Sequence, residues 1–299
     1  MSRNKKIKFA VVGCGHIGKR HASMIQGNEG CELVALCDTR LKAEIGIEAY
    51  PEAVFFCSID ELVNSDLELD VISIATPNGF HEEHALKALG RNCHLVVEKP
   101  MALTKAGCEK VIFKALHKHK QVFCVMQNRY SPPSEWLKNI LDKGILGQIY
   151  MVQINCYWNR DDRYYKPDPK TGRPSSWHGS KELDGGTLFT QFSHFIDLMY
   201  WYFGDIKNIQ AKFNDFAHQK STDFEDSGFV SFDFVDGGMG SLNYSTAVWD
   251  KNLESSITVI AENGSVKVGG QYMNEEEYCH IKDYEMPVLK ESNPPNDYG

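Results

Sequence analysis

The first third of the chain alternates short apolar runs with segments of helical periodicity. The apolar runs predict strands at Ile7–Val12, Glu32–Cys37, Val54–Phe56, Val71–Ala75, His94–Val97 and Val122–Met126. The segments between them predict helices at Ile17–Gln26, Leu41–Ala49, Ile59–Asn64, Glu82–Leu89 and Lys105–His119. Apolar strands that alternate with helices are typical of a parallel sheet covered on both faces. Right-handed connections then make this sheet doubly wound.

The pattern changes near residue 127. Ser131-Pro132-Pro133 interrupts it, and a helix is predicted at Ser134–Asp142 and ended by Gly144. Longer runs predict strands at Ile149–Tyr157, Ile206–Phe216, Gly228–Val235, Met239–Thr246 and Ser256–Ile260, with a hairpin turn at Asp236-Gly237 and one long helix at Gly186–Phe203. We therefore expect an α/β protein of two domains. Residues 1–127 form the doubly wound domain, and residues 128–299 form an α+β domain with a large open, mostly antiparallel sheet.

A glycine pattern lies between the first predicted strand and the first predicted helix. The residues Gly13-Cys14-Gly15-His16-Ile17-Gly18 follow the pattern G-x-G-x-x-G. In this context Gly13 permits a tight turn, Gly15 lets a diphosphate approach the backbone, and Gly18 lets the helix pack on the strand. The helix N-terminus then offers free amides to the phosphates. The pattern predicts a Rossmann-type dinucleotide site.

An acidic residue ends the second predicted strand. Asp38 follows Gly18 by twenty residues, which is where a carboxylate binds the ribose hydroxyls of a dinucleotide. A carboxylate there repels a 2′-phosphate, so we expect NAD as the cofactor. NADP is the second choice, because Arg40 can accommodate that phosphate.

A lysine lies at the end of the fifth predicted strand, in Glu98-Lys99-Pro100. Ligands of doubly wound sheets bind beyond the carboxyl ends of the strands, so Lys99 is a candidate for chemistry. Pro100 favours an extended backbone at Lys99. The structural alternative is a surface lysine that pairs with Glu98.

The long helix predicted in the second half carries a polar stripe. Thr190, His194 and Asp197 recur at intervals of four and three on an otherwise apolar segment, so one face of a buried helix would be polar. Buried polar groups need partners. A core histidine with satisfied hydrogen bonds is the structural interpretation, and acid–base catalysis is the functional one.

These motifs together resemble the glucose–fructose oxidoreductase/inositol dehydrogenase/MocA (Gfo/Idh/MocA) family of nicotinamide-dependent sugar dehydrogenases. The resemblance also rests on Ala75-Thr76-Pro77-Asn78 with His81 and on the Gly185–Asp197 segment, and it spans nearly the whole chain. It implies that Lys99 and His194 are catalytic, although Thr190 stands where the family often has aspartate. It implies that the cofactor contacts Gly13, Gly15, His16, Ile17, Gly18, Asp38, Thr76, Pro77, Asn78, His81, Glu98, Lys99 and Gln127.

A narrower resemblance is to the WlbA/WbpB branch, which oxidises C3 of UDP-N-acetylglucosaminuronic acid for surface-polysaccharide synthesis. It rests on Gln127–Pro133, Trp158-Asn159-Arg160 with Tyr164-Tyr165, Trp177-His178-Gly179 and Leu183–Gly186. The branch typically has Trp-Arg-Gly-Thr where this chain has Trp177-His178-Gly179-Ser180. The resemblance implies that the substrate contacts Lys99, Arg129, Tyr130, Arg160, Tyr165, Thr190, Gln191 and His194. Members usually continue past the point where this chain stops, so we expect a truncated C-terminus.

The segment 158–182 has no clear periodicity over its 25 residues. Structureless stretches longer than about 15 residues are usually functional or disordered. The segment carries a net charge of +2, from Arg160, Arg163, Lys166, Lys170, Arg173 and Lys181 against Asp161, Asp162, Asp168 and Glu182. It also carries Trp158, Tyr164, Tyr165 and Trp177. Cations and aromatic rings suit a diphosphate, a carboxylate and a stacked sugar or base, and the alternative is a solvated loop or an oligomer contact.

Composition narrows the classes of partner. The 299 residues carry a formal net charge of −8, which argues against nucleic-acid and anionic-membrane binding. The nine cysteines are scattered without C-x-x-C spacing, so they indicate buried thiols in a reducing compartment and no metal site. No stretch has the length of a membrane span or a signal sequence. We expect a cytoplasmic homodimer or homotetramer.

The leading hypothesis is hydride transfer from a secondary sugar hydroxyl to NAD. Lys99 is the expected proton acceptor, and His194 is expected to orient the substrate and relay the proton. A second hypothesis is an NAD-dependent glycoside hydrolase, which oxidises transiently and yields no net NADH, or an oxidoreductase of a free sugar or polyol. A third is a non-catalytic sensor of sugar nucleotides.

Overall fold

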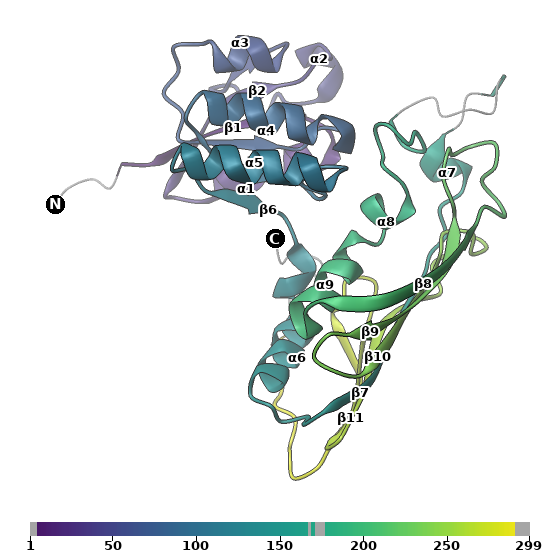
Figure 1. Ribbon diagram of the computed structural model, residues 1–299. Coiled ribbons are helices and arrows are strands. Elements are labelled where there is room, and N and C mark those ends of the chain that lie inside the picture. The colour runs from purple at the N-terminus through teal and green to yellow at the C-terminus, as the bar shows by residue number, and fades with distance from the viewer. Residues whose placement is uncertain (1–4, 167–168, 171–176, 291–299) are drawn as a thin grey trace. The chain divides into compact units, whose positions relative to one another are not determined.

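The computed structural model describes residues 5–166, 169–170 and 177–290, and the chain divides into two compact units. The first unit contains Met1–Val125 together with Glu182–Gly185. The second unit contains Met126–Lys181 and Gly186–Gly299. Each unit has its own sheet (Figure 1). The predicted fold class is therefore confirmed, with a parallel sheet in the first unit and a mostly antiparallel sheet in the second.

The first unit is built on a six-stranded parallel sheet in the order β3-β2-β1-β4-β5-β6. Its strands are β1 (Ile7–Val12), β2 (Cys31–Cys37), β3 (Val54–Phe56), β4 (Val71–Ile74), β5 (His94–Val97) and β6 (Val122–Cys124). Its helices are α1 (His16–Gly27), α2 (Lys42–Ile45), α3 (Ile59–Val63), the 3₁₀ turn η1 (Asn78–Phe80), α4 (His81–Gly90) and α5 (Lys105–His117). The strand order reverses direction between β1 and β4, which is the usual ligand position in a doubly wound sheet.

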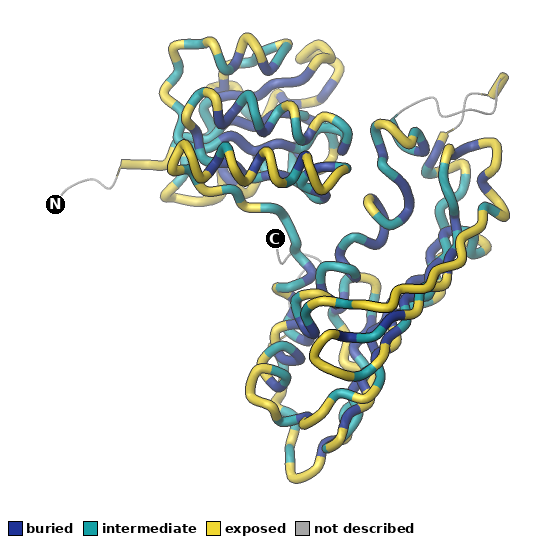
Figure 2. Tube along the Cα trace, viewed as in Figure 1, coloured by how far each residue is buried: buried dark blue, intermediate teal, exposed yellow. Residues whose placement is uncertain are grey.

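Two hydrophobic cores explain why the strands of this sheet are apolar on both faces. Ala10 and Val12 of β1 pack in a core with α3, α4 and α5, whereas Val11 packs in a second core with Ala22 of α1 and Ile45 of α2. Because neighbouring residues of one strand serve opposite cores, alternation with polar residues is absent. The buried strands appear between the more exposed helices in Figure 2.

The second unit is built on a seven-stranded sheet in the order β13-β12-β11-β7-β10-β9-β8. Its strands are β7 (Ile149–Tyr157), β8 (Ile206–Asn214), β9 (Ser227–Phe234), β10 (Met239–Ser245), β11 (Glu254–Ala261), β12 (Gly264–Gly269) and β13 (Glu275–Ile281). Its helices are the 3₁₀ turn η2 (Gln127–Tyr130), α6 (Pro132–Asp142), α7 (Asp162–Tyr165), α8 (Thr187–Thr190) and α9 (Ser193–Phe203). Every pairing is antiparallel except that of β7 with β10.

One face of the second sheet is covered by α6 and α9 (Figure 1). On β7, Val152, Ile154 and Cys156 point into this core, while the residues between them are more exposed. This alternation has period two, as expected for a sheet with one covered face. The edge strand β8 is exposed along nearly its whole length (Figure 2).

The structure corrects three expectations about the second half. Ser131-Pro132-Pro133 is not an interruption: Ser131 caps α6 and Pro132 is its first residue, because the first turn of a helix needs no proline N–H. The predicted helix Gly186–Phe203 is two helices, α8 and α9, separated at Gln191-Phe192. The strands β12 and β13 were not predicted, because β12 is bounded by glycines and β13 is an exposed edge rich in glutamate.

The break between α8 and α9 lies where Phe192 enters the core. Its side chain is fully buried, and its ring packs against Trp158 at 5.1 Å and Tyr244 at 5.5 Å between centroids. Its backbone N–H donates to the carbonyl of Thr187, five residues back, so the helical register widens there.

None of the helices among the described residues has the length and hydrophobicity that a bilayer crossing requires.

Candidate functional site

The glycine loop of the first unit leaves an opening at the N-terminus of α1. A Cβ on Gly13, whose φ is +91°, would lie 2.5 Å from the carbonyl oxygen of Ala75, and a Cβ on Gly18 would lie 1.7 Å from that of Gly13. A Cβ on Gly15 would meet nothing within 4 Å. The first N–H groups of a helix have no partner within the helix. The loop is therefore closed around Gly13 and Gly18 and open at Gly15, which fits a phosphate bound against the helix end.

The side chains of the first helical turn are the other part of this opening. His16 is exposed and Ile17 is 41% exposed, and both lie at the N-terminus of α1. Their positions agree with the predicted contact to a cofactor, which stays a prediction.

Asp38 is placed next to the glycine loop by the end of β2. Its Oδ2 accepts a hydrogen bond of 2.8 Å from the backbone N–H of Cys14 and one of 2.9 Å from Nη2 of Arg40. Burial would raise the pKa of Asp38, but the hydrogen bonds from Arg40 and Cys14 lower it below its ordinary value. The carboxylate is therefore charged at neutral pH and is covered on one side by the half-exposed Arg40.

The loops that follow β4 and β5 are joined by a buried histidine. The ring nitrogens of His81 lie 2.7 Å from the carbonyl oxygens of Thr76 and Pro100, and the side chain is fully buried. Asn78 donates 2.8 Å to the carbonyl of Asp184, which fastens the Glu182–Gly185 segment to the same loop. We expected His81 to contact the cofactor. Its ring holds the two loops together, and the contact with the cofactor stays a prediction.

The side chain of Glu98 is held by hydrogen bonds next to the backbone of Lys99. Its Oε1 lies 2.9 Å from Nε2 of His21, and its Oε2 accepts a hydrogen bond of 3.3 Å from the backbone N–H of Lys99. His21 in turn contacts the hydroxyl of Ser73 on β4 at 2.5 Å. The carboxylate thus ties α1, β4 and the end of β5 together. Sequence reasoning missed His21 and Ser73, although His21 lies three residues after Gly18, on the face of α1 that Gly18 packs against the loop.

The polar residues predicted to form one helical stripe belong to two helices in the second unit. Thr190 ends α8, whereas His194 and Asp197 lie on α9, so the break at Phe192 separates them. Thr190 and His194 are both 7% exposed. Asp197 holds Arg129, whose Nε and Nη2 donate to its two oxygens at 2.6 and 2.5 Å. Arg129 was expected to bind substrate, which stays a prediction. Within the second unit its guanidinium pairs with the carboxylate of Asp197.

Arg160 lies in a neutral, aromatic environment. Its guanidinium carbon is 4.6 Å from the centroid of Trp158 and 5.2 Å from that of Tyr164. Its Nε donates a hydrogen bond of 2.8 Å to Oε1 of Gln191. This contact brings together two residues that were predicted to bind the substrate. Burial lowers the pKa of Arg160, and no carboxylate among the described residues pairs with it. A part-buried cation without an anionic partner is suited to an anionic ligand.

The remaining predicted residues of the second unit differ in exposure. Tyr130 is 62% exposed, whereas Tyr165 is 1% exposed and packs on Tyr164 and His218. The side-chain oxygen of Gln127 is buried without a hydrogen-bond partner among the described residues, so a bound ligand could satisfy it. Arg173 of the basic segment lies outside the described residues. Lys99 belongs to the first unit and His194 to the second, and both assignments as catalytic residues stay predictions.

Two family models match consecutive parts of the chain. Residues 7–126 match the model described as an oxidoreductase family with an NAD-binding Rossmann fold. Residues 135–267 match the model of a Gfo/Idh/MocA C-terminal domain. Together the matches cover most of the chain.

Solved structures and curated proteins agree with these matches. The WlbA dehydrogenase from Bordetella pertussis, solved with NADH and UDP-GlcNAcA, is 32% identical with a TM-score of 0.87, over 94% of this chain and 79% of that one. The WlbA dehydrogenase from Chromobacterium violaceum, with the same ligands, is 31% identical with a TM-score of 0.86, over 95% and 79%. A D-glucoside 3-dehydrogenase from Escherichia coli is 28% identical, over 81% of this chain and 71% of its own length.

Proposed function

Because the chain belongs to the Gfo/Idh/MocA oxidoreductase family, we propose that it oxidises a secondary hydroxyl, at C3, of a nucleotide sugar such as UDP-N-acetylglucosaminuronic acid. Family membership makes the protein an NAD-dependent oxidoreductase of sugar hydroxyl groups, which confirms the expected enzyme class and cofactor. The nucleotide, the uronate, the C3 position and a place in surface-polysaccharide synthesis are the parts that we propose.

The observation that carries the proposal is the environment of Arg160. A sugar nucleotide brings a diphosphate, and a uronate adds a carboxylate, so the substrate would supply the anion that the described residues do not. The rings of Trp158 and Tyr164 beside the guanidinium suit the flat faces of a sugar or base. Free polyols and neutral glycosides offer no such charge. The likeness to two WlbA dehydrogenases solved with UDP-GlcNAcA supports the same substrate class.

The proposed chemistry divides between cofactor and chain. Bound NAD supplies the hydride acceptor. Lys99, in its neutral form, accepts the hydroxyl proton as the hydride leaves, and Glu98 and His21 hold the backbone from which Lys99 extends. We propose that His194 orients the substrate hydroxyl and relays the proton. Asp38 binds the ribose of the cofactor.

The test is NADH formation across a panel of UDP-N-acetylglucosaminuronic acid, UDP-N-acetylglucosamine, a neutral glucoside and myo-inositol. We expect NADH with the UDP-uronate. Arg160→Met should raise the KM for this substrate by about tenfold or more while the KM for NAD is unchanged. The control is Arg163→Met, because Arg163 is exposed and already paired with Asp161 and Asp250.

Three other outcomes would contradict the proposal. NADH formed only from glucoside or inositol indicates an enzyme of free sugars. Release of the aglycone without net NADH indicates a glycoside hydrolase. Binding of UDP-sugars without redox change indicates a sensor.

Cofactor choice should depend on the Asp38–Arg40 pair. Asp38→Ser removes the carboxylate that binds ribose and frees Arg40 to pair with a 2′-phosphate. We expect the ratio of kcat/KM for NAD over NADP to fall by about tenfold or more. The measurement is steady-state kinetics with both cofactors, with Asp60→Ser as the control because that exposed carboxylate pairs with Lys87 on the surface. An unchanged ratio would show that Asp38 does not select the cofactor.

A further inference from the structure

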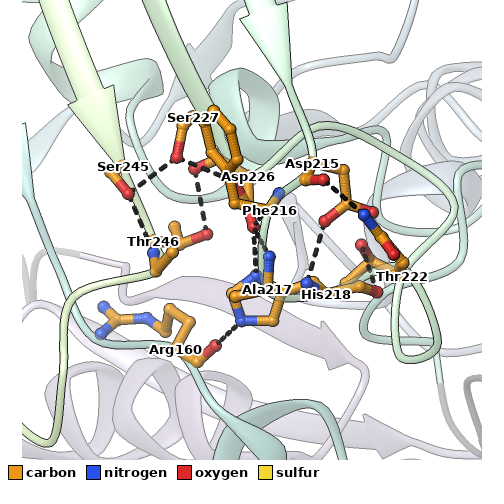
Figure 3. Close-up of polar contacts among 12 residues, drawn as sticks. Arg160, Asp215, Phe216, Ala217, His218, Thr222, Asp226, Ser227, Ser245 and Thr246 are labelled. Carbon is orange, nitrogen blue, oxygen red and sulfur yellow. Dashed lines mark hydrogen bonds and ion pairs between the residues drawn. The ribbon is translucent and has the colours of Figure 1, made fainter.

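A buried polar cluster lies behind Arg160, between the end of β8 and the start of β9 (Figure 3). Its centre is Asp226, which is 1% exposed. Oδ2 of Asp226 accepts hydrogen bonds from the backbone N–H groups of Phe216, at 3.0 Å, and Ala217, at 2.7 Å, and lies 3.0 Å from Nδ1 of His218. Oδ1 of Asp226 accepts a hydrogen bond of 2.8 Å from the hydroxyl of Ser227. Asp226 therefore fixes the first part of the loop between the two strands.

The imidazole of His218 connects this cluster to Arg160. It is 4% exposed, and its Nε2 lies 2.5 Å from the carbonyl oxygen of Arg160. A carbonyl can only accept, so Nε2 carries a proton, and the carboxylate of Asp226 requires one on Nδ1. Burial would lower the pKa of His218, but the hydrogen bonds to Asp226 and Arg160 raise it above its ordinary value. Burial would also raise the pKa of Asp226, yet the contacts of His218 and Ala217 lower it to about 2.

Three side chains of this cluster also have the residue types of metal ligands. Asp215, His218 and Asp226 offer ligand atoms within 4.8 Å of one another. Both ring nitrogens of His218 already contact hydrogen-bond acceptors directly, and Asp215 accepts 2.9 Å from the backbone N–H of His218. The arrangement is that of a hydrogen-bonded imidazole and carboxylate pair.

The backbone of Arg160 is held on both sides by elements anchored at Asp226. Its N–H donates 3.0 Å to the carbonyl of Thr246, whose own N–H donates 2.8 Å to the carbonyl of Asp226. Its carbonyl accepts from His218 on the other side. Figure 3 shows the guanidinium extending away from the imidazole while the carbonyl faces it. The ring of Tyr165, 5.2 Å from that of His218, fills the space beside this contact.

We propose that His218, held by Asp226, is a positioning residue that fixes the backbone of Arg160 and so aims its guanidinium at the anionic part of the substrate. This inference rests on the proposed function, because it takes Arg160 as the residue that binds the substrate anion. His218 is buried, at 4% exposure, so a positioning role does not require it to touch the substrate. Its effect passes through the carbonyl of Arg160, between residues 58 positions apart in sequence.

The test is a double-mutant cycle with UDP-N-acetylglucosaminuronic acid as the probe. His218→Leu should raise the KM for this substrate by about tenfold and leave the KM for NAD unchanged. His218→Gln offers an amide N–H to the same carbonyl and should recover much of the loss. In an Arg160→Met background, His218→Leu should raise the KM no further, because the positioned group is gone. His280→Leu, at an exposed histidine of β13, is the matched control.

The outcomes separate this inference from the proposed function. If the wild type forms no NADH from the probe, the proposed function fails. If it does, but Arg160→Met leaves the KM for the probe unchanged, Arg160 does not bind the anion and this inference fails by itself. If Arg160→Met raises this KM, but His218→Leu raises it by the same factor in the Arg160→Met background as in the wild type, the positioning role is overturned. It is also overturned if His218→Leu raises the KM for NAD by the same factor as the KM for the probe. Amide hydrogen exchange gives a readout without substrate: His218→Leu should accelerate exchange at Arg160 relative to wild type and to His280→Leu. Unchanged exchange would also overturn the inference.

Discussion

Replacing Lys99 with methionine should lower kcat by about 100-fold or more while the cofactor still binds. Methionine keeps most of the length of the side chain and removes the amine, so the hydroxyl proton has no acceptor when hydride transfer begins. General base catalysis contributes about 100-fold to 10,000-fold, and we expect kcat to fall within this range. The cofactor contacts that we propose for the glycine loop and Asp38 lie on other elements, so the Kd for NADH, measured by fluorescence titration, should stay within about twofold of wild type.

The control for this experiment is Lys110→Met. Lys110 lies on α5 of the same unit, is well exposed, and pairs with Glu82 on the surface. Its replacement should change neither kcat nor the Kd for NADH, because exposed ion pairs contribute little. A rate in Lys99→Met close to that of wild type would remove Lys99 from the mechanism. Loss of NADH binding in Lys99→Met would instead assign it to the cofactor site.

The elements of the first unit could be predicted well because their signals are local. Each strand is a mostly apolar run, since neighbouring residues such as Ala10 and Val11 enter opposite cores. The glycine loop could be found for the same reason, because its residues are adjacent in sequence and their spacing has a steric cause. The role of His81 could not, since its two partners, the carbonyls of Thr76 and Pro100, follow different strands.

The second unit shows where a local pattern stops being sufficient. The edge strand β13 has no apolar alternation, because its residues are stabilised by pairing with β12 and face solvent. The break at Phe192 follows from a ring that packs against Trp158 and Tyr244, residues distant in sequence. The same limit applies to the candidate site. The aromatic and basic composition near Arg160 was visible, whereas the contacts that set its environment come from Gln191 and His218.

The second large effect is expected from the glycine loop, where two alanine substitutions should fail in different ways. A Cβ on Gly18 would lie 1.7 Å from a backbone carbonyl, so Gly18→Ala forces α1 away from the loop and should cost about 1–3 kcal/mol or more of stability. A Cβ on Gly15 meets nothing within 4 Å, and its φ of −70° is accessible to alanine. Gly15→Ala should therefore keep the stability of the protein without cofactor.

Binding of NAD distinguishes the two glycines. We propose that the diphosphate approaches the backbone in the space that Gly15 leaves open. Gly15→Ala should then weaken NADH binding by about tenfold or more with an unchanged Tm of the apoprotein. Gly18→Ala should lower both the affinity for NADH and the Tm of the apoprotein. Gly27→Ala, near the other end of α1, also adds a Cβ with no neighbour within 4 Å and should change neither. Thermal unfolding with and without NADH measures both quantities. Wild-type NADH affinity in Gly15→Ala would place the diphosphate elsewhere, because no bound phosphate could then occupy the position of the added methyl group.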